Sequence, residues 1–193
     1  MSRHARRSLG LALLVNLAIL TGCTGSNEGG DSGFVISDDR TITRVPAADR
    51  EPAPDLFGEL VGGGSFALAD VRGDDIVVVN VWGSWCGPCR AEAATLERVS
   101  QDLADDGVQF LGLNTRDQEA AALAFLRRFD VTYPNLDDTD AQLQLAFRDS
   151  LPSASIPTTW VIDRRGRVAA QTISGVTEER LRAMIEPVLA ETP

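Results

Sequence analysis

The chain has 193 residues, of which 44% are hydrophobic, and it carries a formal net charge of -10 at pH 7. A chain of this length and composition is sufficient for one globular domain with a proper core. The acidic balance argues against a nucleic-acid partner, because binding to phosphates needs a basic face. We therefore expect a single domain that binds no nucleic acid.

The first 22 residues are typical of an export signal. Arg3, Arg6 and Arg7 precede a largely apolar run over Leu9–Leu20, and this stretch contains no acidic residue. The run is too short to span a bilayer comfortably. Residues 1–22 are therefore predicted to be a signal peptide.

A short motif ends this signal. The sequence Leu-Thr-Gly-Cys at Leu20–Cys23 resembles the lipobox of bacterial lipoproteins, in which the signal is removed before a cysteine that then carries the lipid. The resemblance implies lipidation of Cys23 and a position on the extracytoplasmic face of the bacterial cell membrane. Acyl chains buried in the membrane would hold the protein there. A secreted protein with a free Cys23 and an uncleaved anchor are the alternatives.

Removal of the signal would also remove His4, the only histidine. Its loss excludes a His-dependent triad and a His-ligated metal in the mature domain. Residues 23–51 are rich in glycine, proline and small polar residues, so they are predicted to be a flexible linker. Within it, residues 40–45 could form a strand. The folded domain is expected over residues 52–193.

The first part of the folded domain is predicted to contain a hairpin and two buried strands. Residues 56–68 alternate in polarity and are interrupted by Gly62–Gly64, which predicts a hairpin with a loose turn. The runs Ile76–Trp82 and Val108–Asn114 are apolar on both faces, as buried parallel strands are.

Helices are expected after each of these strands. Apolar residues on one face predict the first helix over about residues 87–105. A second helix is predicted over about residues 118–129. Thr115 and Gln118 have the spacing of a capping box, which favours a helix start at this point.

The C-terminal part is predicted to contain a short helix, a hairpin and a final helix. The short helix is expected over residues 141–147, and the hairpin over residues 158–173. Thr177 is expected to cap the last helix, and Pro187 inside it should kink or restart the helix. The order of elements is that of an α/β fold, a sheet with helices on its faces.

Two of the three cysteines stand at the start of the first helix. Because the preceding strand ends at Trp82, Cys86 is expected at the helix N-terminus and Cys89 one turn later. Unpaired backbone N–H groups and the helix dipole favour a thiolate there, and a thiol in such a motif can have a pKa of about 7. Cys86 would attack a substrate disulfide, and Cys89 would then resolve the mixed disulfide; the reverse sequence oxidises a dithiol.

Two other interpretations of the cysteine pair are weaker. Half a zinc site would need further ligands, and the mature chain offers no histidine and only one other cysteine. A purely structural disulfide would enclose too short a loop to remove much unfolded-state entropy. Redox chemistry is also consistent with the odd cysteine count, because lipidation of Cys23 leaves one pair in a compartment that permits disulfides.

Four segments together resemble one known family. They are "VWGSWCGPCRAE", "FLGLNTRD", "YPNLDD" and "SIPTTWVIDRRGRV". They are similar to the membrane-tethered thiol-disulfide oxidoreductases of the TlpA/ResA/CcmG type, over about residues 52–189. The resemblance implies an α/β fold, the thioredoxin fold, with an N-terminal β-hairpin and a central αβ insertion at about residues 114–147.

The same resemblance implies a function. Members reduce protein disulfides outside the cytoplasm, often those of apocytochrome c during cytochrome c biogenesis, with electrons from a membrane thiol carrier. No cofactor is implied beyond the redox-active disulfide of Cys86 and Cys89. The alternatives are an oxidase that installs disulfides in exported proteins, and a lipoprotein that only binds a partner.

The resemblance also assigns site residues. Ile156-Pro157 matches the cis-proline dipeptide that lies against the cysteines, and it would leave Ile156 backbone groups free to bind a substrate peptide. Glu92 matches an acidic residue near the cysteines. It follows Cys89 by three residues on the same helix face, so burial could raise its pKa and let it accept the Cys89 proton. A solvated charge paired with Arg90 is the alternative.

Residues beside the cysteines complete the candidate site. Trp85 is expected to flank the substrate groove, with simple packing as the alternative. Gly87 and Pro88 are expected to contact the substrate and to tune the redox potential, and Pro88 also fits the first helical turn. Some cytochrome-maturation members carry an acidic residue where Gly87 stands here, which weakens the apocytochrome assignment but not the reductase class. Asn80 replaces the buried Asp of ordinary thioredoxins, so Glu92 becomes the better proton acceptor.

Overall fold

The structure is a computed structural model that describes residues 35–36, 42–71, 73, 75–153 and 155–191. These residues belong to one compact unit. The predicted signal peptide and Cys23 lie outside the described residues.

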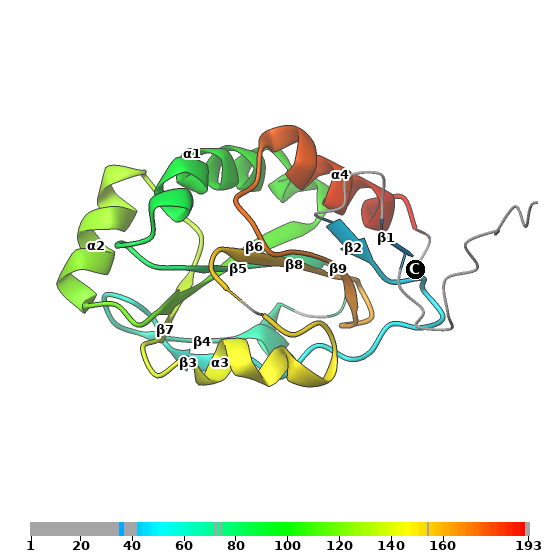
Figure 1. Cartoon of the computed structure of the whole chain (residues 1–193), viewed down its shortest axis with the longest axis horizontal. Coiled ribbons are helices and arrows are strands. Elements are labelled where there is room, and N and C mark those ends of the chain that lie inside the picture. Colours follow the sequence, from blue (N-terminus) through cyan, green and yellow to red (C-terminus); the bar gives the residue numbers. More distant parts are fainter. Residues whose placement is uncertain (1–34, 37–41, 72, 74, 154, 192–193) are drawn as a thin grey trace, which may run out of the picture. The chain divides into compact units, whose positions relative to one another are not determined.

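A seven-stranded sheet forms the centre of the fold (Figure 1). Its strands are β1 (Val35–Ile36), β2 (Ile42–Arg44), β5 (Ile76–Trp82), β6 (Val108–Thr115), β7 (Asn135–Asp138), β8 (Thr158–Ile162) and β9 (Val168–Thr172). Their order in the sheet is β1-β2-β9-β8-β5-β6-β7. The pairs β5–β6 and β6–β7 are parallel, and the remaining pairs are antiparallel. A separate hairpin consists of β3 (Phe57–Glu59) and β4 (Ser65–Ala67).

Helices cover both faces of this sheet. They are α1 (Gly87–Asp102), α2 (Glu119–Arg128), α3 (Gln142–Leu145) and α4 (Glu178–Leu189), with short 3-10 turns η1 (Leu68–Asp70), η2 (Ala104–Asp106) and η3 (Ala146–Asp149). In Figure 1, α1 and α4 lie on one side of the sheet, and α3 and the β3–β4 hairpin lie on the other. The predicted α/β architecture with an N-terminal hairpin is confirmed.

Two apolar cores result from this layering. Every residue of β5 is buried, because the strand is central and covered on both faces. Val78 faces the core shared with α1 and α4, which includes Leu96 and Met184. Val79 faces the opposite core, where the rings of Phe147 and Trp160 stack with their centroids 3.9 Å apart.

The start of α2 differs from the predicted capping box. Its N-cap residue is Gln118, which makes no side-chain cap. Thr115 is the last residue of β6, and its Oγ1 instead accepts a hydrogen bond from Gln144 Nε2 at 3.0 Å. The backbone N–H of Gln118 donates a hydrogen bond to Asp117 Oδ1 at 2.8 Å. The capping-box prediction was therefore wrong, because tertiary contacts engage the threonine.

The last helix begins as predicted but passes through its proline. Thr177 caps α4 by accepting a hydrogen bond from the backbone N–H of Arg180. The helix does not restart at Pro187 and continues to Leu189. Because proline has no backbone N–H, Pro187 cannot donate the helical hydrogen bond to the carbonyl of Ala183, one turn earlier. Arg44 of β2 donates to that carbonyl at 3.1 Å and satisfies it.

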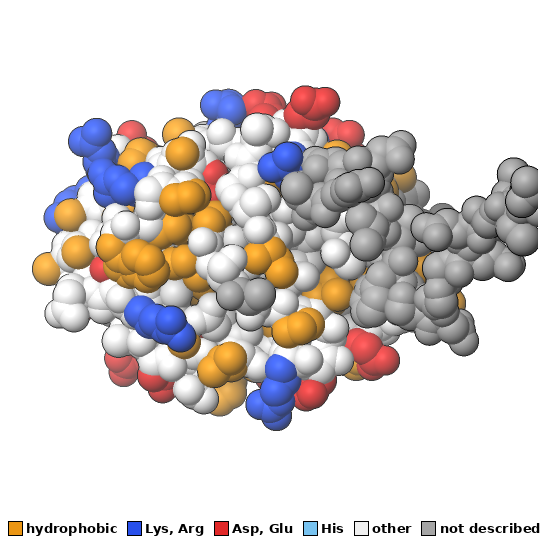
Figure 2. Space-filling model, viewed as in Figure 1, with side chains coloured by type: hydrophobic (Ala, Val, Ile, Leu, Met, Phe, Trp, Pro, Cys, Tyr) orange, Lys and Arg blue, Asp and Glu red, His pale blue; other side chains and the backbone are white. Residues whose placement is uncertain are grey.

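Apolar side chains are exposed on one face of the molecule. Figure 2 shows several of them on the face between α1 and α3. The large exposed apolar side chains of the described part are Phe57, Trp85, Leu145 and Ile173. Two of these, Trp85 and Leu145, line the same groove, which is described below. None of the described helices is both long and apolar enough to cross a membrane.

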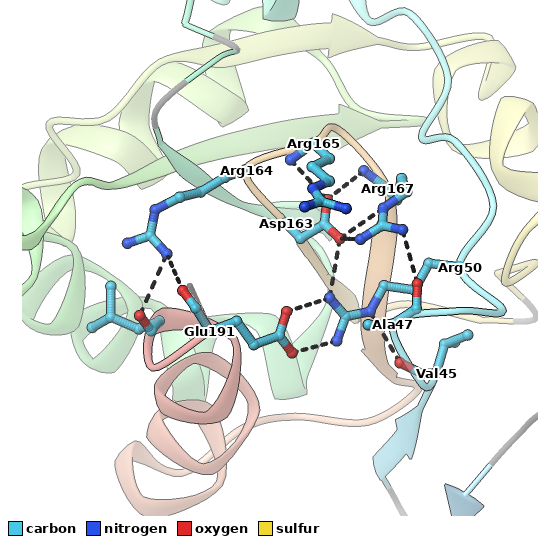
Figure 3. Close-up of polar contacts among 9 residues, drawn as sticks. Val45, Ala47, Arg50, Asp163, Arg164, Arg165, Arg167 and Glu191 are labelled. Carbon is cyan, nitrogen blue, oxygen red and sulfur yellow. Dashed lines mark hydrogen bonds and ion pairs between the residues drawn. The ribbon is translucent and has the colours of Figure 1, made fainter. Parts of the chain in front are cut away.

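Part of the predicted linker belongs to the folded domain. The strand β2 pairs with β9, and Val45 is buried. The Arg50 side chain is only 5% exposed and forms ion pairs with Asp163 at 3.0 Å and Glu191 at 2.6 Å (Figure 3). Composition suggested a domain start at residue 52, but these long-range contacts place residues 42–51 in the fold.

Candidate active site

Cys86 and Cys89 form a disulfide at the N-terminus of α1. Cys86 is the N-cap residue, with an extended backbone (φ -82°, ψ 114°), and its Sγ accepts a hydrogen bond from the backbone N–H of Cys89 at 3.2 Å. Cys86 is 5% exposed and Cys89 only 1%, so Cys86 is the more exposed residue of the pair. In the reduced protein this position favours a thiolate, since N–H groups and the helix dipole point at it.

The loop before Cys86 is folded back onto the end of β6. Trp85 is 57% exposed, and its indole Nε1 donates to the carbonyl of Arg116 at 3.1 Å. A Cβ on Gly83 would lie 2.8 Å from that indole nitrogen, so a larger residue would displace the ring. Arg116 has a φ of 50°, which L-residues rarely adopt. Non-glycine residues held in this region cluster at functional sites.

Asp117 fixes the same loop through its carboxylate. It accepts hydrogen bonds from the backbone N–H and the hydroxyl of Ser84, at 2.6 and 2.8 Å, from Asn114 Nδ2 at 3.1 Å and from the N–H of Gln118 at 2.8 Å. Burial raises the pKa of Asp117, but the hydrogen bonds from Ser84, Asn114 and Gln118 outweigh it, so the pKa lies below its ordinary value.

Sequence reasoning did not identify Asp117. The available signal was its place just after β6, since the carboxyl ends of parallel strands β5 and β6 meet at one edge of the sheet.

Glu92 is buried in the helix turn after Cys89. It is 2% exposed; its Oε1 accepts from Asn80 Nδ2 at 3.0 Å, and its Oε2 accepts from the N–H of Val176 at 2.8 Å. Burial raises the pKa of Glu92 to about 7, although the bonds from Val176 and Asn80 oppose the shift. Glu92 is thus neither solvated nor paired with Arg90, whose Nη1 donates to the carbonyl of Ser84.

The peptide bond between Ile156 and Pro157 is cis, as the resemblance implied. Pro157 is buried, and Ile156 packs against the apolar cluster that contains both cysteines. Ile156 also lines a groove of about 380 Å³, together with Trp85, Thr115, Arg116, Gln144, Leu145, Ser153 and Ser155. The structure therefore brings Trp85 and Ile156 together in one groove, with α3 as a third wall.

The residues between the cysteines differ in their surroundings. A Cβ on Gly87 would meet no atom within 4 Å, so this position is open to solvent or to a substrate. Pro88 lies in the first turn of α1, close to Gly175. A Cβ added to Gly175 would lie 3.8 Å from Pro88 Cβ and 3.7 Å from Glu92 Oε2. Among the described side chains, no group of three or more His, Cys, Asp or Glu residues could hold a metal ion.

Comparisons with known proteins agree with this site. Residues 50–171 match the AhpC/TSA family. The chain is 34% identical over 128 residues to the thiol:disulfide interchange protein HelX of Rhodobacter capsulatus. The aligned residues make up 66% of this chain and 68% of HelX. It is 28% identical over 149 residues to the thiol-disulfide oxidoreductase ResA of Bacillus subtilis, covering 77% and 80% of the two chains.

Solved structures give the same result. A secreted thiol-disulfide isomerase from Corynebacterium glutamicum superimposes with a TM-score of 0.69 and 31% identity, over 80% of this chain and 95% of that one. A DsbF homologue from Corynebacterium diphtheriae has a TM-score of 0.67 and 34% identity, over 76% and 92%. The chain therefore belongs to the AhpC/TSA family and is a thioredoxin-fold thiol-disulfide oxidoreductase of the type that includes ResA and HelX.

Proposed function

We propose that this oxidoreductase works as a reductase of protein disulfides outside the cytoplasm, held at the membrane by a lipid on Cys23. The observation that carries the proposal is the arrangement of Cys86, which is the more exposed of the two cysteines, caps α1 and lies beside a groove lined by Trp85 and Ile156. An extended polypeptide suits such a groove, because its main chain can bond to free backbone groups and its side chains can fill the groove.

The reaction begins with the reduced protein. The Cys86 thiolate attacks one sulfur of the substrate disulfide, and the other substrate sulfur leaves as a thiolate that takes up a proton. Cys89 then attacks Cys86 Sγ of the mixed disulfide and releases the second substrate thiol. Glu92 accepts the Cys89 proton, since a group with a pKa of about 7 can be ionised and still bind a proton near neutral pH. Two electrons pass to the substrate, and the chain ends as the disulfide seen here.

The partners of this reaction are also part of the proposal. A membrane thiol carrier supplies the two electrons that return Cys86 and Cys89 to thiols. Apocytochrome c is the first substrate to test, because the resemblance to the TlpA/ResA/CcmG type implies it. A lipid at Cys23 keeps the domain close to both, and replacement of Cys23 by serine should release the protein from the membrane fraction of cells.

The decisive test is the reduction potential of the Cys86/Cys89 couple in glutathione or dithiothreitol buffers, read by tryptophan fluorescence. A value near or below about -250 mV is expected for a reductant, whereas a value of about -120 to -150 mV would identify an oxidase instead. A Cys89→Ser variant should accumulate the mixed disulfide with substrate, and Cys86→Ser should not. Accumulation in both variants would contradict the assignment of Cys86 as the nucleophile.

A further inference from the structure

Four exposed arginines come from the first turn of α1, the residue after β6 and the last turn of α2, and they have no carboxylate partner among the described residues. They are Arg90, Arg116, Arg127 and Arg128. Five other described arginines form ion pairs with aspartate or glutamate: Arg50, Arg98, Arg148, Arg167 and Arg182. Arg44 and Arg165 form none among the described residues, but they lie on β2 and in the β8–β9 turn, away from the cysteines. The chain as a whole is acidic, with 28 acidic and 18 basic residues, so a group of arginines near the cysteines is a local excess of positive charge.

Phe129 connects two of these arginines to the cysteines. The guanidinium carbons of Arg90 and Arg128 lie 5.7 and 5.8 Å from the centroid of its ring. Phe129 itself packs against the apolar cluster that contains Cys86 and Cys89. Cation–π contacts of this kind hold a guanidinium in place without neutralising it. Figure 2 shows basic side chains gathered over α1 and α2, next to exposed apolar ones.

The other two arginines extend the basic surface. Arg116 lines the groove beside Trp85 and Ile156. Arg127 is exposed at the last turn of α2, next to Arg128. Arg116 thus lies at the groove, Arg90 at the loop carbonyl of Ser84 and Arg128 at Phe129, and Arg127 is the neighbour of Arg128 in α2.

Acidic residues nearby do not neutralise this surface. Asp117 is buried, and its carboxylate is occupied by Ser84, Asn114 and Gln118. Glu119 lines a different cavity, together with Glu59 and Asp137. Asp130, which is exposed and follows Phe129, is the one acidic neighbour on this side among the described residues of α2 and its C-terminal turn.

We propose that Arg90, Arg116, Arg127 and Arg128 form a docking surface for an acidic segment of the polypeptide whose disulfide reacts with Cys86. The inference rests on the proposed function and names a property of its substrate: carboxylates close to the reacting cysteines. Arginine suits this role, because its planar guanidinium binds carboxylates in a bidentate manner. Charges at the rim of an interface mainly accelerate encounter and make it sensitive to salt.

The test compares two disulfide-bridged peptides of equal length, one with glutamates beside the bridge and one with glutamines. Stopped-flow fluorescence gives the second-order rate constant for their reaction with the reduced protein. At about 0.01 M ionic strength, where the Debye length is about 30 Å, the acidic peptide should react about five times faster. At about 1 M, where that length is about 3 Å, the two rates should converge.

A matched pair of variants locates the effect. Arg128→Gln and Arg165→Gln change the net charge equally, but Arg165 lies in the β8–β9 turn, at the opposite end of β8 from Pro157. Arg128→Gln should lower the ratio of acidic to neutral rates about threefold at low salt, and Arg165→Gln should leave it unchanged. Equal rates for the two peptides, or equal effects of the two variants, would overturn the docking surface. Absence of exchange with either peptide would instead overturn the proposed function.

Discussion

Glu92 has a different charge in the folded and the unfolded chain at pH values between its ordinary pKa of 4.5 and its raised pKa of about 7. Burial raises its pKa from 4.5 to about 7 in the folded state. Between these values the unfolded chain releases the proton more readily, so the contribution of Glu92 to stability is fully present below the unfolded pKa and is lost as the pH rises through the folded pKa. The shift corresponds to about 3 kcal/mol of unfolding free energy.

Glu92→Gln should remove this dependence. Urea unfolding of the oxidised protein at about pH 4 and about pH 8 should show wild type losing about 3 kcal/mol relative to the variant between the two pH values. Other titrating groups cancel in the comparison, because both proteins contain them. A difference between wild type and variant that is the same at both pH values would show that Glu92 keeps an ordinary pKa.

Asp117 should matter for the reactivity of Cys86 because it fixes the loop that carries it. In Asp117→Ala, Ser84 loses both of its bonds to the carboxylate. We expect a loss of about 1–3 kcal/mol in stability and a slower reaction of the reduced protein with a neutral disulfide peptide. Ser84→Ala removes only the hydroxyl bond and serves as the milder comparison. An Asp117→Ala protein with wild-type rate and stability would contradict this role.

The two residues show what a sequence can predict at this scale. The cysteines follow from a local signal, two residues apart at the junction of a strand and a helix. The buried carboxylate of Glu92 accepts hydrogen bonds from Asn80 and Val176, and that of Asp117 accepts them from Ser84, so both environments are set by contacts between distant segments. Only the family resemblance singled out Glu92; it included Asp117 in a matching segment but assigned that residue no role.

At the scale of elements, β6 must pass very close to Trp82 at the end of β5. A Cβ on Gly112 would lie 1.8 Å from Asn135 Oδ1 and 2.8 Å from Trp82 Nε1, two atoms that are themselves hydrogen-bonded at 2.8 Å. The Trp82 ring also stacks on Phe125, with centroids 4.3 Å apart, in the cluster that surrounds the cysteines. Strand pairing, the indole and the active-site packing therefore depend on one another.

Gly112→Ala tests this dependence. We expect it to lower the free energy of unfolding by about 3 kcal/mol, through overpacking and the loss of the Trp82–Asn135 bond. Gly87→Ala is the matched control, since its Cβ would meet no atom within 4 Å, and it should change stability by less than about 1 kcal/mol. Equal midpoints for the two variants in urea would show that β6 can move away from the indole.

Elements with a strong local pattern were predictable, and those that depend on distant partners were less so. The apolar runs of β5 and β6 and the Thr177 cap of α4 were found from the sequence. Thr115 was misread as a helix cap because Gln144, almost thirty residues later, takes its hydroxyl. Pro187 was expected to disturb α4, and Arg44 from a distant strand explains how the helix accommodates it.

At the scale of the whole molecule, β1 and β2, which precede residue 52, extend the central sheet beyond β9. A composition rich in proline and small residues concealed this, because β2 has only three residues and gains its stability from pairing with β9. The buried guanidinium of Arg50 forms ion pairs with Asp163 in the β8–β9 turn and with Glu191 just after α4, and so connects the segment before residue 52 to both. Residues 42–51 are therefore expected to unfold together with the rest of the domain.

Arg50→Met should therefore be costly although it lies far from the cysteines. We expect a loss of about 3 kcal/mol, because removal of one partner leaves buried charge uncompensated. Arg167 still faces Asp163 and limits the damage. Chains that begin at residue 42 and at residue 52 provide the second comparison, and the shorter one should melt at a lower temperature. Equal melting temperatures would place the domain boundary at residue 52 after all.

The direction of β8 places the Arg50 ion pairs far from the cysteines, which matters when the chain is pulled. Because β8 runs antiparallel to β5, the turn at Asp163 lies at the end of the sheet away from Trp82 and the active-site loop. A pull on the chain from its N-terminal side would be resisted first by the β1–β2 and β2–β9 pairings and then by the contacts of Arg50. Tension would thus be absorbed at one edge and one end of the sheet, while the cysteines keep their geometry for the next exchange.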